Sequence, residues 1–154
     1  MKRNYVFTYG TLLKDERNHE YYLKDEDYIC DGFITGYKMF NLGRYPGIKT
    51  GEGIVLGEIY LVDDETLATL DYLEEEGSLY IRRIVSVNSS NDIYDAFVYI
   101  YNQNVDNPIY LGEGIYSWRK LDNISVDDLI EMGIDKTVVT KYLKYNLNNK
   151  IIHN

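Results

Sequence analysis

The chain has 154 residues, of which 45% are hydrophobic, so we exclude a disordered protein and expect one domain with one sizeable core. The formal net charge of −9 argues against general binding to nucleic acids or to anionic membrane surfaces. A single cysteine and two histidines exclude an internal disulfide bond and the usual zinc sites. The start of the chain has no apolar run long enough for a signal peptide or a membrane span, so we expect a soluble cytoplasmic protein.

The first third of the chain is typical of two strands joined through a short helix. Asn4–Tyr9 is rich in β-branched and aromatic residues and predicts a first strand. Residues 11–23 predict a turn that leads into a short polar helix. Ile29–Phe40 predicts a second strand, with bulges or sharp coiling at the two glycines that interrupt it, Gly32 and Gly36.

The middle of the chain predicts a loop, a strand and a helix. Asn41–Gly53 is rich in glycine and is interpreted as a loop, and Ile54–Val62 as a strand. Asp63 or Asp64 is the expected N-cap of the helix that follows, and Gly77 is its expected stop.

Two further strands complete the expected sheet. Tyr80–Val87 and Ile93–Tyr101 are rich in β-branched and aromatic residues, and Asn88–Asp92 between them has the composition of a turn. Strands therefore outnumber helices, with both hairpin-like and strand–helix–strand connections. The fold class that we predict is α+β, with a small, mixed, barrel-like β-sheet and flanking helices.

The C-terminal part is expected to be helical. Ser125–Met132 begins with a residue suited to an N-cap, Gly133 interrupts the pattern, and Asp135–Leu147 is interpreted as a closing helix. We therefore expect a domain over residues 1–121 and a helical C-terminal extension over residues 122–154 that packs on the same domain.

Three other features of the sequence are weaker functional signals. The helices on either side of Gly133 faintly suggest a helix-turn-helix, but a DNA-binding element needs a basic face, and this segment is only mildly basic. His19 is expected on the surface of a helix. Cys30 has no evident partner base and is interpreted as an inert thiol rather than a nucleophile.

The Tyr-Gly-Thr-Leu segment, Tyr9–Leu12, is a candidate binding loop. It follows a strand and precedes a helix, so its backbone N–H groups are expected to lack partners and to attract carboxylates or phosphates. Gly10 allows a ligand to approach the backbone closely. The segment is not a phosphate-binding P-loop, because no lysine follows a second glycine at the required spacing. A plain turn is the alternative interpretation.

Three consecutive glutamates, Glu74, Glu75 and Glu76, end the predicted middle helix. Carboxylates are unfavourable at a helix C-terminus, because the unpaired backbone carbonyl groups there are already partly negative. One interpretation is a solvated helix end paired with nearby arginines. The other is that one glutamate faces a pocket, where burial raises its pKa and suits it to act as a general base and acid.

Taken in order, these segments resemble the γ-glutamylcyclotransferase-like superfamily, which includes γ-glutamylamine cyclotransferases of the AIG2-like type. VFTYGTLLKDERNH resembles the opening strand and loop of the family, and RYPGIKTGEGIVLGEIYLVDDETLATLD resembles its Tyr-Pro loop, the next strand and the following helix. LDYLEEEGSLYIRR resembles its Leu-Asp-x-Φ-Glu signature followed by Tyr-x-Arg, where Φ is apolar or aromatic. Two positions depart from the pattern. Asp15 stands where many relatives have Gly, and Tyr116-Ser117 replaces the Gly-Asp of a Gly-Asp-Trp ending.

The resemblance implies a reaction and roles for individual residues. The α-amine of a γ-glutamyl amine or amino acid would attack its own γ-carbonyl group, which releases 5-oxoproline and a free amine without a cofactor. Glu74 would be the catalytic acid and base, with Tyr80 and Arg82 as the Tyr-x-Arg pair and Tyr9–Leu12 (Tyr9, Gly10, Thr11, Leu12) as the substrate-binding loop. Tyr9 and Tyr80 would bind substrate or simply pack.

The expected partner is thus a small γ-glutamyl compound, with no nucleic acid and no membrane, and the protein would be a monomer or a homodimer. The amine half of the substrate is not specified by the sequence. The alternative function is a non-catalytic small-molecule-binding or interaction protein on the same fold.

Overall fold

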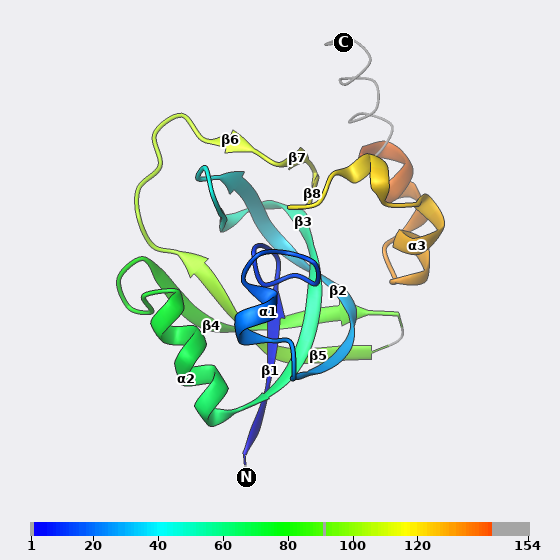
Figure 1. Ribbon diagram of the computed structural model, residues 1–154. Coiled ribbons are helices and arrows are strands. Elements are labelled where there is room, and N and C mark those ends of the chain that lie inside the picture. The colour runs from blue at the N-terminus through cyan, green and yellow to red at the C-terminus, as the bar shows by residue number, and fades with distance from the viewer. Residues whose placement is uncertain (1, 91, 143–154) are drawn as a thin grey trace.

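The computed structural model describes residues 2–90 and 92–142 of the chain. The elements within these residues are β1 (Arg3–Thr8), α1 (His19–Tyr22), β2 (Asp27–Asn41), β3 (Pro46–Asp63), α2 (Asp64–Leu73), β4 (Tyr80–Ser89), β5 (Asp92–Tyr101), β6 (Ile109–Tyr110), β7 (Gly112–Glu113), β8 (Ile115–Tyr116), a 3₁₀ turn at Leu121–Asn123, and α3 (Val126–Glu131). The predicted α+β class is confirmed (Figure 1).

One strongly curled, mixed sheet contains all the described strands, in the order β6-β2-β4-β5-β1-β3-β8-β7. β2 also pairs with β3, so the sheet bends back on itself. The β2–β4 and β1–β5 strand pairings are each limited to one residue pair in register, Phe33 with Asn88 and Val6 with Phe97. The sheet is therefore barrel-like rather than a regular closed barrel, and α2 lies along its outside (Figure 1).

The hairpin of β2 and β3 is longer than the sequence predicts. We interpreted Asn41–Gly53 as a loop, but β3 begins at Pro46 and pairs with β2 along almost its full length. The sequence pattern is weak there, because the glycines interrupt the run of side chains by which a strand is recognised. Gly36 does mark a bulge, with φ of 89°, whereas the second bulge lies between Tyr28 and Cys30 and not at Gly32.

The helices are shorter than predicted. Within residues 11–23 only α1 is helical, because backbone turns such as Leu13 N–H to Gly10 C=O (3.0 Å) and Asn18 N–H to Thr11 C=O (3.0 Å) occupy the rest. The N-cap of α2 is Asp63, whose carboxylate accepts a hydrogen bond from the Thr66 N–H at 2.8 Å. α2 ends before the expected stop at Gly77.

The apolar side chains form three clusters. One fills the inside of the curled sheet, and a second lies between the sheet and α2, where Val6, Tyr60 and Leu70 are buried. The third joins Phe33 and Leu56 of the sheet to apolar residues of the C-terminal segment, Leu129, Ile134 and Val139.

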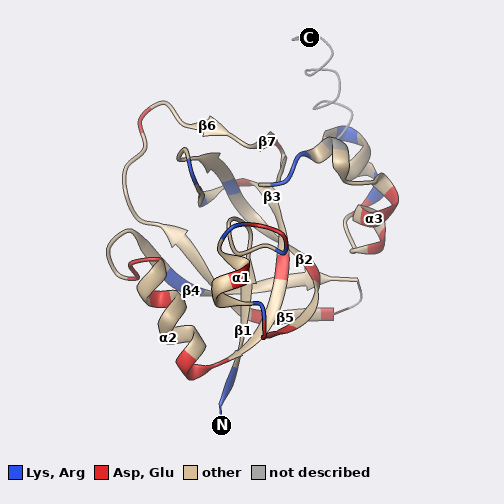
Figure 2. Cartoon of the chain, in the orientation of Figure 1, with Lys and Arg blue, Asp and Glu red and all other residues tan. Residues whose placement is uncertain are grey.

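The C-terminal segment begins as predicted, with Ser125 as the N-cap of α3; its hydroxyl group accepts from the Asp128 N–H at 3.0 Å. Residues 136–142 are helical, and the rest of the predicted closing helix lies outside the described residues. Figure 2 shows acidic residues along α3, which carries Asp127, Asp128 and Glu131. None of the described helices is long and apolar enough to cross a membrane.

Candidate active site

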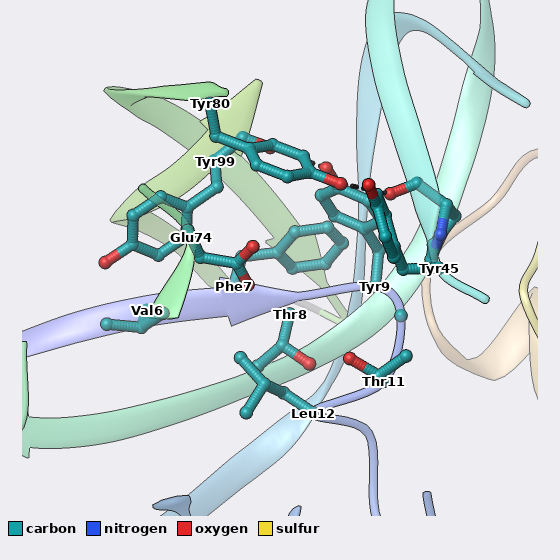
Figure 3. A pocket seen from close by; sticks show the side chains of 12 residues that line it. Val6, Phe7, Thr8, Tyr9, Thr11, Leu12, Tyr45, Glu74, Tyr80 and Tyr99 are labelled. Atoms are coloured by element: carbon teal, nitrogen blue, oxygen red, sulfur yellow. Dashed lines mark hydrogen bonds between the residues drawn. The ribbon is translucent and has the colours of Figure 1, made fainter. Parts of the chain in front are cut away.

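A cavity opens where the end of β1, the start of β3 and the end of α2 meet. Its lining combines one acidic side chain with aromatic rings and a backbone turn (Figure 3): Val6, Phe7, Thr8, Tyr9, Gly10, Thr11, Leu12, Tyr45, Pro46, Glu74, Tyr80 and Tyr99. All six residues that the sequence selects as catalytic or substrate-binding belong to this lining. They come from two parts of the chain that are far apart in the sequence, residues 9–12 and residues 74–80, and the fold brings them together.

The turn at Tyr9–Leu12 is held from outside the cavity. The Asn18 side chain donates to the Thr11 hydroxyl group at 2.8 Å, and a ring nitrogen of His19 lies 3.0 Å from the Leu12 carbonyl oxygen. Gly10 packs so tightly on β3 that a Cβ atom there would lie 2.7 Å from Pro46 Cγ. Among the described residues, none accepts a hydrogen bond from the N–H groups of Gly10, Thr11 or Leu12. The turn therefore presents unpaired donors to the cavity, as an anion-binding loop requires.

The end of α2 directs Glu74 into the cavity. Glu74 is the C-cap, and Glu75 follows it in the left-handed conformation with φ of 49°. The Glu76 N–H donates to the Asp71 carbonyl at 2.9 Å and the Glu75 N–H to the Tyr72 carbonyl at 3.2 Å, the two bonds of a Schellman motif. The helix therefore ends at Leu73, and the predicted stop at Gly77 is wrong because Glu75 takes the position that glycine usually occupies.

The three glutamates are thereby separated. Glu75 and Glu76 are exposed, and a carboxylate oxygen of Glu76 accepts from the Arg82 N–H at 3.2 Å. Glu74 is partly buried, and Figure 3 shows its carboxyl group pointing toward the ring of Phe7. Only the first glutamate of the run thus lines the cavity, and it is the one that the family resemblance selects.

The surroundings of Glu74 favour its protonated form. Burial raises the pKa of its carboxyl group from 4.5 to about 7. No hydrogen-bond donor of the described residues compensates the ionised carboxylate, and the carbonyl end of α2 adds partial negative charge beside it. A carboxyl group that titrates near neutral pH can both accept and return a proton.

Tyr9 and Tyr80 donate to the backbone from within the cavity wall. The Tyr9 hydroxyl group donates to the Tyr99 carbonyl at 2.6 Å, and the Tyr80 hydroxyl group donates to the Pro46 carbonyl at 2.7 Å. Burial, and next the charge of Glu74, raises the pKa of Tyr80, so it stays neutral at physiological pH. Both hydroxyl protons are engaged, which leaves each tyrosine oxygen as an acceptor only.

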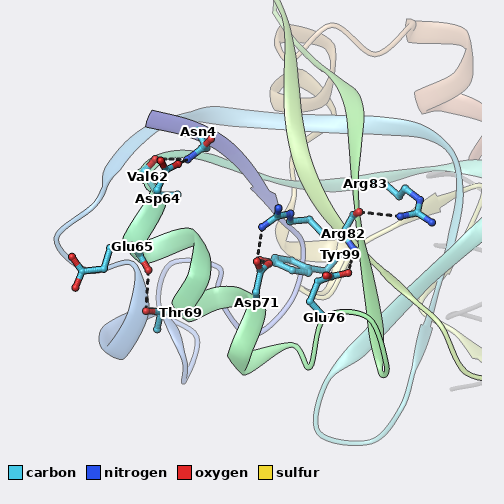
Figure 4. A network of polar contacts seen from close by, with 10 residues as sticks. All are labelled: Asn4, Val62, Asp64, Glu65, Thr69, Asp71, Glu76, Arg82, Arg83 and Tyr99. Atoms are coloured by element: carbon cyan, nitrogen blue, oxygen red, sulfur yellow. Dashed lines mark hydrogen bonds and ion pairs between the residues drawn. The ribbon is translucent and has the colours of Figure 1, made fainter. Parts of the chain in front are cut away.

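A polar network fixes the last turn of α2 to the sheet (Figure 4). Asp71 accepts from the Tyr99 hydroxyl group at 2.7 Å and from the Arg82 guanidinium group at 2.5 Å. The Arg82 guanidinium carbon also lies 4.5 Å from the centre of the Phe97 ring. Because Asp71 is one turn before Glu74, these contacts position the acid, although Asp71 and Arg82 do not line the cavity themselves.

Several residues that the sequence singled out lie elsewhere. Arg82 acts through Asp71 and does not line the cavity, and His19 supports the turn from behind. Cys30 lines a separate cleft between the sheet and the C-terminal segment. The departures at Tyr116 and Ser117 are buried but outside the cavity lining.

Six residues of the lining were not selected from the sequence, and three of them, Thr8, Tyr45 and Tyr99, have polar side-chain groups. Thr8 and Tyr99 belong to strands, where Thr and Tyr are ordinary, so their types carried no signal. Tyr45 belongs to the segment that resembles the Tyr-Pro loop of the family, and this resemblance was the one sequence signal that pointed to it. For metals, the described residues contain no cluster of three or more His, Cys, Asp or Glu side chains that could bind an ion.

Curated relatives share most of their length with this chain. "Gamma-glutamylcyclotransferase family protein YtfP" of Escherichia coli K12 is 33% identical over 101 residues, which cover 66% of this chain and 85% of the relative. A "putative gamma-glutamylcyclotransferase" of Vibrio cholerae is 39% identical over 100 residues, 64% of this chain and 82% of the relative. The "gamma-L-glutamyl-butirosin B gamma-glutamyl cyclotransferase" of Niallia circulans is 32% identical over 121 residues, 75% of each chain.

Solved structures and a family model agree with these relatives. An AIG2-like protein from Mus musculus superposes with a TM-score of 0.63 at 27% identity, over 68% of this chain and 81% of the other. The ytfP protein of Escherichia coli superposes with a TM-score of 0.58 at 30% identity, over 73% and 95% of the chains. The model of the family "gamma-glutamyl cyclotransferase, AIG2-like" matches residues 6–120. The chain belongs to the γ-glutamyl cyclotransferase, AIG2-like family.

Proposed function

We propose that the protein is a γ-glutamylcyclotransferase that releases 5-oxoproline and a free amine from a γ-glutamyl amine or amino acid. The observation that carries the proposal is the Glu74 carboxyl group, which lies in a cavity, lacks a donor among the described residues and has a pKa of about 7. The names of the relatives point to the same chemistry, and family membership raises its prior.

The reaction moves two protons from one nitrogen of the substrate to the other. Glu74, as a carboxylate, accepts a proton from the α-ammonium group, and the resulting amine attacks the γ-carbonyl carbon to form a five-membered ring. Glu74, now a carboxylic acid, returns this proton to the leaving amine nitrogen as the bond from that carbon to this nitrogen breaks. The attacking nitrogen also gives up a second proton, which the released amine takes up to become an ammonium ion, so no proton is gained or lost overall.

The other residues of the cavity hold the substrate in position. The free N–H groups of Gly10, Thr11 and Leu12 bind the anionic groups of the γ-glutamyl unit. The rings of Tyr9 and Tyr80 enclose the substrate and exclude water. Because nucleophile and electrophile belong to one molecule, holding it in a ring-closing conformation supplies much of the rate, and the proposed step uses no cofactor.

The test is 5-oxoproline release from a panel of γ-glutamyl compounds with amino acid, peptide, polyamine and lysine side-chain leaving groups. Glu74→Gln keeps the shape of the side chain and removes the base. Glu75→Gln is the matched control, since it removes the same charge from the exposed neighbour. We expect wild type and Glu75→Gln to release 5-oxoproline equally, and Glu74→Gln to be slower by about 10²–10⁴-fold.

Two results would count against the proposal. Equal release by wild type and Glu74→Gln would place the base elsewhere. Binding of panel compounds without any release would favour the alternative, a non-catalytic small-molecule-binding protein on this fold.

A further inference from the structure

Thr8 carries an unexplained polar group at the edge of the cavity. Its side chain is 4% exposed, and its hydroxyl group has no hydrogen-bond partner among the described residues. No other fully buried side-chain nitrogen or oxygen within those residues lacks a partner; the Glu74 carboxyl group, which also lacks a donor, is only partly buried. A buried hydroxyl group without a partner destabilises a fold, so such groups call for an explanation.

The position of Thr8 suggests what its hydroxyl group serves. Thr8 ends β1, one residue before the turn whose N–H groups are also unpaired, and it lines the same cavity as Glu74. In Figure 3 its hydroxyl oxygen points toward the Thr11 side of the cavity. The Thr11 hydroxyl group accepts from Asn18 and makes no hydrogen bond with Thr8. The unpaired Thr8 hydroxyl group and the unpaired N–H groups of the turn therefore belong to the lining of one cavity.

We propose that Thr8 is a substrate-binding residue whose hydroxyl group hydrogen-bonds the γ-glutamyl half of the substrate; this assignment rests on the proposed function. The γ-glutamyl half offers carboxylate, ammonium and carbonyl groups, and a hydroxyl group can pair with any of them as donor or acceptor. Rotation about the single χ1 bond lets the hydroxyl group turn from its sheltered position toward a bound ligand.

The assignment predicts opposite effects of one substitution on the free protein and on its complex. Thr8→Val has the same shape without the hydroxyl group. In the free protein it removes an unpaired polar group, so the melting temperature should be equal to or above that of wild type. In the complex it removes a hydrogen bond, so the KM for γ-glutamyl compounds and the Kd for 5-oxo-L-proline should rise roughly three- to tenfold.

A matched threonine outside the cavity supplies the control. The Thr66 hydroxyl group donates to a carboxylate oxygen of Glu26 at 2.7 Å in the first turn of α2. Thr66→Val should therefore lower the melting temperature and leave KM and Kd unchanged, the reverse of Thr8→Val. Thr8→Ser keeps the hydroxyl group and should restore most of the affinity.

The experiment measures the melting temperature of the ligand-free proteins, 5-oxo-L-proline and L-glutamate binding by calorimetry, and KM over the substrate panel. Because the contact is to the γ-glutamyl half, the KM increase in Thr8→Val should be the same for every leaving group. A lower melting temperature in Thr8→Val, an unchanged KM and Kd, or an increase confined to one leaving group would each overturn the assignment.

Failure of the proposed function gives a different pattern. If wild type releases no 5-oxoproline, the reaction is wrong, and the calorimetry decides the role of Thr8 alone. Weaker binding of L-glutamate or 5-oxo-L-proline by a fully stable Thr8→Val would then retain the assignment. Absence of binding of both by wild type would overturn it.

Discussion

Two glutamates beside the end of β1 have opposite surroundings. Glu58 on β3 is 5% exposed, and its carboxylate accepts from the Lys14 N–H at 2.8 Å and from the Tyr60 hydroxyl group at 3.1 Å. It also pairs with Arg119 at 3.3 Å. Glu74 receives no hydrogen bond from the described residues. The difference shows that burial alone does not make a carboxylate available for chemistry; the supply of donors decides between a structural and a reactive group.

The region around Glu58 is a junction between distant segments. Trp118 donates to a carboxylate oxygen of Glu16 at 2.5 Å, and Arg119 contacts both Glu58 and the Lys14 carbonyl oxygen. These bonds tie the segment after β8 to the loop that follows the candidate binding turn. The region around Glu74 has the reverse organisation, in which the polar contacts surround the acid and leave its carboxyl group open to the cavity.

Among the substitutions that test this comparison, we expect Glu74→Gln to have the largest effect on stability. Below pH 4.5 the carboxyl group is protonated in both the folded and the unfolded chain, so Glu74 and Gln should be nearly equivalent. Between pH 4.5 and about 7 the unfolded chain loses the proton while the folded chain keeps it, so wild type loses stability as the pH rises. Above pH 7 the loss is complete.

At pH 8 we therefore expect the free energy of unfolding of Glu74→Gln to exceed that of wild type by about 2–3 kcal/mol, after allowance for solvent screening. Urea denaturation at pH 4 and at pH 8 measures the difference. A difference independent of pH would mean that the pKa of Glu74 is the same in the folded and unfolded chain.

The same substitution at Glu58 should change the free energy of unfolding in the opposite direction. Glu58→Gln removes the charge from an acceptor of three groups, so we expect a loss of about 1.5–3 kcal/mol in the free energy of unfolding at pH 8. Turnover of the folded fraction should be largely retained, because Glu58 does not line the cavity. Parallel denaturation and activity measurements check both parts, and a loss of turnover without a loss of stability would assign Glu58 to the chemistry.

Much of the site around Glu74 could be predicted from the sequence, but little of the region around Glu58. The run of three glutamates was identifiable because acids at a helix end break a local rule, and the family resemblance then selected Glu74 within it. The Tyr-Gly-Thr-Leu segment was identifiable because strand-to-helix turns leave N–H groups free. Glu58 stands in a strand as one polar residue among apolar ones. Its donors, Lys14, Tyr60 and Arg119, come from distant segments, and one sequence does not show which segments meet.

The fold was predictable where the pattern is local. The strands at both ends of α2, its N-cap Asp63 and the cap Ser125 follow short-range rules, and the structure contains them. The end of α2 could not be predicted, because Glu75 adopts a left-handed conformation that its residue type does not favour. The extent of β3 depends on pairing with β2 rather than on its own glycine-rich start.

The most direct test is a titration of the Glu74 carboxyl carbon by NMR in protein labelled with ¹³C-glutamate, its signal assigned by its absence from Glu74→Gln. A midpoint near pH 7 is the predicted result, in agreement with a carboxyl group that burial alone perturbs. A midpoint near pH 4.5 would contradict the account, because it would mean that solvent or a hydrogen-bond donor satisfies Glu74 as fully as an exposed glutamate.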